Sequence, residues 1–135
     1  MQPKPMFLLY PVVSEQLAEE LHEHAFDDGE FRHLFLPNRV RLRACVVRLE
    51  NKIIGWSGFL VPNTINPVGR VGTYIDKPYR KKGFAREATH TLLARMRVEN
   101  ILCRAVTHDR DMPWRKFITE ALEAHGFKSA HIKGR

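Results

Sequence analysis

Hydrophobic residues gather in six short runs along the chain, and turn residues separate these runs. Runs of this length and composition are typical of β-strands. They predict strands over residues 6–12, 42–49, 52–61, 68–75, 101–107 and 127–132. The tight turn at Glu50 and Asn51 and the loop at 62–67 predict that the second, third and fourth of these strands form an antiparallel meander.

The segments between these strands have helical spacing. Leu17 and Leu21 recur at a spacing of four after Ser14, which is a good N-cap residue. The pattern predicts a first helix from about Ser14, a short helix over 31–36 ended by Pro37, a long helix from Gly83 to Asn100, and a last helix from Asp111 that ends before Gly126. The predicted order is βααβββαβαβ, a mixed α/β fold in a single domain that spans residues 1–135.

Composition agrees with a globular protein. The chain has 135 residues, of which 44% are hydrophobic and 27% are charged. No apolar run approaches the roughly 18 to 20 residues that a membrane span requires, so we expect a cytoplasmic protein with no membrane segment. Cys45 and Cys103 both lie in apolar strand runs, and His22 and His24 point to different sides of a helix. We therefore expect reduced cysteines and assign no metal site.

The net charge of +7 is unevenly distributed. Residues 14–30 contain seven acidic residues and no Lys or Arg, whereas residues 31–135 contain 21 Lys and Arg against eight Asp and Glu. Most of the molecule should therefore attract phosphates, while the first helix repels them. Nucleic acid and a phosphorylated cofactor are both candidate ligands on this evidence.

The most informative segment is 71–86, which has the pattern of a strand, a basic turn with a glycine, and a helix start. Unpaired N–H groups at a helix N-terminus favour a phosphate, and Gly83 lets the backbone approach it closely. Five positive charges belong to this turn, with no acidic residue from 77 to 86: Lys77, Arg80, Lys81, Lys82 and Arg86. The segment therefore predicts an anion site.

Within this segment, Arg80-Lys81-Lys82-Gly83-Phe84-Ala85 resembles the signature of the GNAT superfamily of acyl-CoA-dependent N-acyltransferases. That signature is Arg or Gln, two residues, Gly, one residue, and Gly or Ala, directly after the fourth strand. Ile75 at the end of a strand, Tyr79 just before the arginine, and the Gly126-Phe127 pair after the last helix fit the same family. The resemblance is sharpest over residues 52–107.

The resemblance implies that acetyl-CoA binds where the fourth and fifth strands splay apart. Its pyrophosphate would lie on the backbone amides of residues 80–85, and its pantetheine arm would pair with the backbone around Tyr74 to Asp76. A backbone N–H near Ile75 would stabilise the oxyanion while the acetyl group passes to a primary amine of a small molecule or protein. The cofactor-binding candidates are Tyr74, Ile75, Asp76, Arg80, Lys81, Lys82, Gly83, Phe84, Ala85 and Arg86.

Some positions depart from the family pattern. Residues 68–74 contain no carboxylate, although many members carry a glutamate base on this strand. Leu122 stands where members often have a tyrosine that protonates the thiolate, and Arg115 stands where they often have an asparagine. One strand follows the last helix where the family usually has two, so the sheet edge is either short or completed by a partner subunit in a homodimer.

Without that glutamate, His108 is the best candidate for the catalytic base, because it follows the fifth strand beside the expected thioester and histidine titrates near neutrality. Asp109 or Asp111 would orient its ring. The alternative is a half-exposed loop histidine. Tyr79 and Tyr74 are candidates to protonate the thiolate, with packing against the cofactor or the core as the alternative.

The first helix carries Glu15, Glu19, Glu23 and Asp27 at a spacing of four, so like charges are neighbours. This stripe favours a cationic acceptor amine, with an acidic solvated face as the alternative. Two other functions are left open: an acetyl-CoA-binding protein with little catalysis, and a basic module that binds nucleic acid or another partner. Nucleic acid is not favoured, because no recognised binding motif is present.

Overall fold

The computed structural model describes residues 3–25, 35–38, 40–65, 67–96, 102–105 and 112–129. Its strands are β1 (Met6–Tyr10), β2 (Leu42–Leu49), β3 (Lys52–Leu60), β4 (Gly69–Ile75), β5 (Leu102–Ala105) and β6 (Lys128–Ser129). Its helices are α1 (Glu15–His22), α3 (Phe84–Arg95) and α4 (Met112–Ala124), with short 3-10 helices η1 (Leu36–Asn38) and η2 (Lys77–Tyr79). None of the helices in these ranges is long and apolar enough to cross a membrane.

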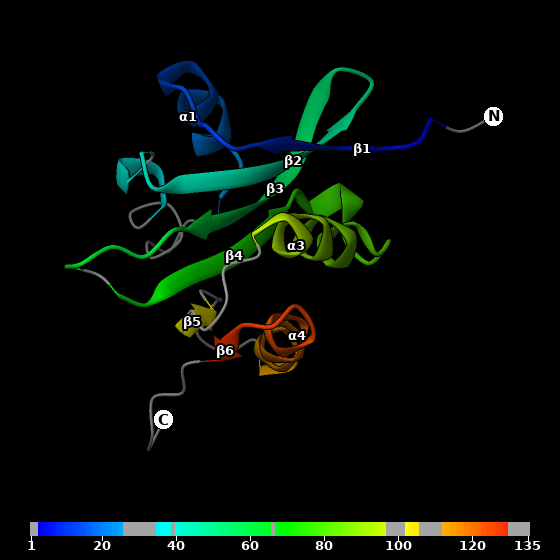
Figure 1. Cartoon of the computed structure of the whole chain (residues 1–135). Helices are drawn as coiled ribbons and strands as arrows, with labels where there is room; N and C mark the ends of the chain where they lie inside the picture. The colour runs from blue at the N-terminus through cyan, green and yellow to red at the C-terminus, as the bar shows by residue number, and fades with distance from the viewer. Residues whose placement is uncertain are drawn as a thin grey trace.

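The six strands form one sheet in the order β1-β2-β3-β4-β5-β6, as Figure 1 shows. Strands β1 to β4 are antiparallel neighbours, so the predicted meander of β2, β3 and β4 is confirmed. Strand β5 is parallel to β4 and to β6, and α3 and α4 supply the two crossovers that parallel pairs require. The mixed α/β fold is confirmed. Residues 31–34 of the helix expected over 31–36 lie outside the described residues, and the expectation that Pro37 ends it is wrong, because the 3-10 helix η1 runs through Pro37 to Asn38.

Local signals account for most element boundaries. The Ser14 hydroxyl accepts a hydrogen bond from the Leu17 N–H at 3.1 Å and caps α1, as the sequence predicts. Gly126 follows α4 with a φ of 86°, in the left-handed region that favours glycine after a helix. Glu50 and Asn51 have φ of 50° and 69°, as the two-residue turn of a hairpin requires.

The sheet separates two apolar layers. Helix α1 covers one side, where Leu21 packs in a cluster with the fully buried Trp56. Helices α3 and α4 cover the other side, where Leu92 and Ile118 pack in a cluster with Phe59. We call these the α1 side and the α3 side of the sheet. Strand β4 lies between them and contributes side chains to both.

Candidate functional site

Within the described residues, strand β4 pairs with β3 on one edge from Arg70 to Ile75 and with β5 on the other edge from Gly69 to Val71. Its pairs with β3 run from Arg70, opposite Leu60, to Ile75, opposite Gly55. Its parallel pairs with β5 end at Val71. Beyond Val71, the part of the chain that the structure describes places no strand on this edge of β4. The described part of β5 ends at Ala105, opposite Val71, so the splay beyond this point stays a prediction from the sequence.

The ladder between β3 and β4 determines which backbone groups point toward the β5 edge of β4. The Asp76 N–H donates to the Ile54 carbonyl at 2.7 Å, so these two residues are a hydrogen-bonded pair. Because such pairs alternate with non-hydrogen-bonded ones, Ile75 directs its N–H and carbonyl away from β3 and toward β5. The backbone groups of Tyr74 and Asp76 face β3 instead. Of the three residues expected to pair with the pantetheine arm, Ile75 is therefore the one whose amide faces the β5 edge of β4, where the splay is expected.

The turn between β4 and α3 contains two residues in the left-handed region. Lys81 has a φ of 64° and Gly83 a φ of 85°. Gly83 is the N-cap of α3 and makes no side-chain cap, so it leaves room at the first N–H groups of the helix. A Cβ built on Gly83 would meet no atom within 4 Å. The space beside Gly83 is therefore open at the start of α3, where the positive end of the helix dipole lies.

A pocket of about 150 Å³ opens at this turn. It is lined by Ile75, Tyr79, Arg80, Lys81, Gly83, Phe84, Ala85 and Arg86. Seven of the ten residues expected to bind the cofactor belong to this wall, together with Tyr79. The other three, Tyr74, Asp76 and Lys82, are not part of it.

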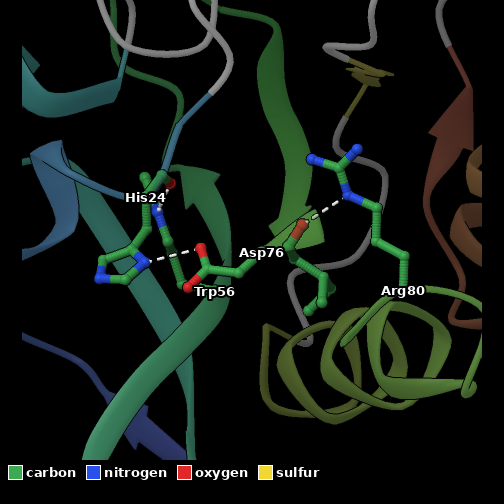
Figure 2. A network of polar contacts seen from close by, with 5 residues as sticks. His24, Trp56, Asp76 and Arg80 are labelled. Carbon is green, nitrogen blue, oxygen red and sulfur yellow. Dashed lines mark hydrogen bonds and ion pairs between the residues drawn. The ribbon is translucent and has the colours of Figure 1, made fainter. Parts of the chain in front are cut away.

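Arg80 joins this turn to the end of β4. Its Nε donates to the Ile75 carbonyl at 2.7 Å (Figure 2). Its guanidinium carbon lies 5.3 Å from the centre of the Tyr74 ring. Arg86, on the first turn of α3, places its guanidinium carbon 4.4 Å from the centre of the Phe117 ring on α4. The two arginines therefore position the turn against neighbouring elements as well as supplying positive charge.

Asp76 turns its side chain to the α1 side, where it meets His24. The distance from His24 Nδ1 to Asp76 Oδ1 is 2.8 Å, and the side chains are 18% and 21% exposed. The Trp56 Nε1–H donates to the His24 carbonyl at 2.7 Å, as Figure 2 shows. From the sequence, His24 is a candidate only as a metal ligand and Asp76 only for its backbone. No local pattern indicates their contact, because 52 residues separate them.

The expected catalytic residues fall in different places. His108, Asp109 and Asp111 lie outside the described residues. Tyr79 lines the pocket, and its N–H donates to the Asp76 carbonyl at 2.9 Å. Leu122, where many family members have a tyrosine, is fully buried in the α3-side core. Within the described ranges, no three His, Cys, Asp or Glu side chains are grouped as metal ligands would be.

The α3 side of β4 carries a buried chain of hydroxyls. Thr73 Oγ1 lies 2.8 Å from Ser57 Oγ and 2.7 Å from Thr89 Oγ1 on α3. Ser57 donates in turn to the Gly72 carbonyl at 3.3 Å. Thr89 Oγ1 also donates to the Ala85 carbonyl at 2.7 Å. Since each hydroxyl has one proton, three protons serve these four contacts, and Thr73 directs its proton to either Ser57 or Thr89. The chain ties α3 to the two central strands beneath the pocket.

Cys45 is buried in the same layer. Burial and, to a smaller extent, the negative charge of Glu87 together raise the pKa of its thiol from 9.0 to about 12. The thiol is therefore un-ionised at neutral pH, as expected of a structural cysteine.

The sequence matches the acetyltransferase (GNAT) family over residues 9–123, so the chain belongs to this family. No curated protein matches it in sequence. A ribosomal-protein-alanine N-acetyltransferase from Brucella melitensis biovar Abortus 2308 is 21% identical with a TM-score of 0.55, over 98% of this chain and 96% of that one.

Two further solved structures contain coenzyme A. An aminoglycoside N-acetyltransferase in complex with CoA is 10% identical with a TM-score of 0.59, over 100% of this chain and 96% of that one. The PaiA N-acetyltransferase from Thermoplasma acidophilum, in complex with coenzyme A, is 14% identical with a TM-score of 0.56, over 89% of this chain and 88% of that one. At these identities the structural likenesses show that the fold is shared.

Proposed function

We propose that this chain is an N-acetyltransferase that transfers an acetyl group from acetyl-CoA to a primary amine. The observation that carries the proposal is the pocket at the start of α3, whose wall holds most of the family signature. Coenzyme A in two structures of the same fold supports the choice of donor. The family match supports the reaction class.

The residues at the pocket fit the phosphates of such a donor. The N–H groups at the start of α3 would hold the pyrophosphate, where an anion is stabilised by the helix dipole. Arg80, Lys81 and Arg86 add positive charge at the same wall. The open space above Gly83 allows the close approach of phosphate oxygens to the backbone.

Bound acetyl-CoA would supply a thioester carbonyl for the amine to attack and a thiolate that leaves. The Ile75 N–H, which faces the β5 edge of β4, would donate to the carbonyl oxygen as negative charge develops on it. The strand holds this amide in place before the reaction. His108 stays the sequence-based candidate for the base, with Tyr79 at the pocket wall as the candidate proton donor to the thiolate.

A second candidate function is binding of acetyl-CoA with little catalysis. It is favoured by the fully buried Leu122 at the position of the family tyrosine, and by the absence of a carboxylate in residues 68–74. Release of free thiol from acetyl-CoA with a panel of primary amines separates the two functions. Binding without thiol release for any amine would support the second.

The phosphate role of the turn is tested by a pair of glycine substitutions. Gly83 and Gly126 have φ of 85° and 86°, and a Cβ at either meets no atom within 4 Å. Alanine should therefore introduce similar backbone strain at both, about 1 kcal/mol. We expect G83A to weaken acetyl-CoA binding about tenfold in calorimetry, because the methyl group occupies the space of the phosphate. G126A is the control, and equal affinities in the two variants would contradict the proposed site.

We further propose a cationic acceptor, since Glu19 and Glu23 are exposed on α1. Replacing both with glutamine should raise the acceptor KM severalfold at low salt and leave the KM for acetyl-CoA unchanged. The same double change at Glu120 and Glu123, exposed on α4, removes equal charge elsewhere and is the control. If both double variants have the same acceptor KM, the acidic side chains of α1 do not bind the acceptor and form only a solvated surface.

A further inference from the structure

The Asp76–His24 pair stands at the end of β4, directly after the residue whose amide faces the β5 edge of that strand. We propose that this pair receives the proton of the acceptor amine: Asp76 holds the ring of His24, and His24 Nε2 accepts the proton that the ammonium group must lose. This inference rests on the proposed acetyl transfer. It assigns the role of the base to His24, in place of the sequence-based candidate His108, and a positioning role to Asp76.

The contact selects one tautomer of the imidazole. An ionised carboxylate only accepts hydrogen bonds, so a 2.8 Å contact with Asp76 Oδ1 places the proton of the neutral ring on Nδ1. Nε2 is then the unprotonated, basic nitrogen. Figure 2 shows it on the side of the ring that points away from Asp76. Enzymes recurrently use a histidine in this way: a carboxylate binds one ring nitrogen, and the other nitrogen acts as the base for the nucleophile.

The pair is fixed from two directions. The carboxylate holds the ring from β4, and the Trp56 Nε1–H holds the His24 backbone from β3 at 2.7 Å. Trp56 is itself fully buried, so the anchor is part of the α1-side core. A base held on strands in this way needs little reorganisation when a substrate arrives.

Its position separates the proton chemistry from the phosphate chemistry. Side chains alternate along a strand, so Asp76 lies on the α1 side with Tyr74, which packs against that layer. The basic turn begins at the β5 edge of β4, where Arg80 Nε donates to the Ile75 carbonyl (Figure 2). An amine on the α1 side would therefore meet His24, while the donor phosphates lie at α3.

The reaction gives this proton a defined path. A primary ammonium group has no lone pair, so it must lose one proton before its nitrogen can attack. The N–C bond then forms as the C–S bond breaks, the nitrogen loses its second proton to give the amide, and the leaving thiolate takes up one proton to become the thiol. One proton passes to His24 Nε2 and from there to solvent, which the 18% exposure of the side chain permits. No group is oxidised or reduced.

Several charged groups belong to the elements packed around His24. They are Glu15, Glu19 and Glu20 of α1 with Glu23 at its C-cap, Arg43 and Arg48 of β2, Lys52 of β3, Arg70 of β4, and Asp76 directly after β4. Asp76 contacts the ring, and Glu20 lies 3.9 Å from Arg48. The pH dependence of the reaction is therefore assigned to His24 only if replacing His24 abolishes it and replacing Glu20 leaves it unchanged.

The test compares H24Q and D76N with H22Q, a matched control at an exposed histidine on α1. With the wild-type chain, kcat/KM for the amine should rise across the range in which imidazoles titrate, about pH 5 to 8. H24Q should lose roughly 100-fold in kcat together with this dependence. D76N should lose at least about tenfold, because an amide no longer selects the tautomer. H22Q and E20Q should match wild type, and acetyl-CoA affinity should be unchanged in all variants.

A second measurement does not depend on activity. Nitrogen-15 NMR of the imidazole should show the Nδ1–H form of His24 in wild type and a mixture of tautomers in D76N. Retained turnover and pH profile in H24Q would overturn the inference while leaving the proposed function standing. The inference would also be overturned if H24Q lost turnover together with a lower Tm and weaker acetyl-CoA binding. That result would show that His24 has a structural role only. A wild-type chain that acetylates no amine would overturn the proposed function itself.

Discussion

The two sides of β4 build their parts of the candidate site in different ways. On the α3 side, one continuous stretch from Ile75 to Arg86 forms the pocket, and its geometry follows from a turn and a helix start. On the α1 side, His24, Trp56 and Asp76 come from three separate elements and meet only in the folded chain. The first kind of site is encoded locally, whereas the second depends on tertiary packing.

This difference also changes what a substitution does. A local site is held by backbone conformation, so its weak points are the left-handed residues Lys81 and Gly83. A site assembled from distant segments is held by the hydrogen bonds that join them. We therefore expect a substitution on the α1 side to act by removing a single hydrogen bond. A substitution in the core on the α3 side should act by disturbing the buried layer between the sheet and the helices α3 and α4.

The largest expected effect concerns the shielding of the α3 side. With the pKa of Cys45 raised to about 12, the thiolate fraction at pH 8 is about 1,000-fold below that of a thiol at 9.0. Alkylation of Cys45 in the native chain, followed by mass spectrometry, should be slower by at least that factor than in urea. Rapid alkylation of the native chain would show that this layer is open.

The same thiol gives a pH dependence of stability with a definite sign. Its folded pKa is raised, so the native state binds more protons than the unfolded state between about pH 9 and 12. Stability from this group is present below pH 9 and is lost as pH rises toward 12. Replacing Cys45 with valine should flatten this loss in urea titrations, and an equally steep loss in that variant would assign it to other groups.

An intermediate effect is expected in the hydroxyl chain beneath the pocket. T89V removes the helix member of the chain and leaves Thr73 with one partner fewer, which should cost about 1 to 2 kcal/mol of unfolding free energy. T91V makes the same change at a half-buried position on the same helix and is the control. Equal midpoints for the two variants in urea would mean that the chain adds nothing to the packing of α3.

The smallest effect is expected at the surface of the α1 side. Glu20 and Arg48 are 3.9 Å apart with side chains 46% and 25% exposed, so solvent screens their attraction. E20Q should change the unfolding free energy by less than about 0.5 kcal/mol. H24Q should cost more, because its contact with Asp76 is shorter and less exposed. A reversed order would show that the exposed pair holds α1 on the sheet.

The sequence predicts the parts of this molecule that depend on local order. The bounds of β2, the Ser14 cap, the hairpin turn and the glycine after α4 all follow from neighbouring residues. The family match confirms the resemblance read from the signature at Arg80 to Ala85. Most of the residues that line the pocket belong to this same short segment, and the sequence names them as cofactor-binding candidates.

The sequence does not predict contacts between distant residues. His24 lies beyond the end of α1, and its pairing with Asp76 depends on how that helix crosses the sheet. The choice of Ile75 over Tyr74 and Asp76 depends on the register between β3 and β4, which a single sequence pattern leaves open to a shift of one residue. The role of His108 stays a prediction, since it lies outside the described residues.

The hydrogen bond from Trp56 has an optical consequence. Its indole is fully buried, lies 5.9 Å from the Phe35 ring, and donates to the His24 carbonyl. Indole emission shifts in wavelength when the ring gains water or loses a hydrogen-bond acceptor. Since the chain has two tryptophans, replacing Trp114 with phenylalanine leaves one emitter. The fluorescence of Trp56 then reports directly whether the segment after α1 is docked on the sheet, with no attached label.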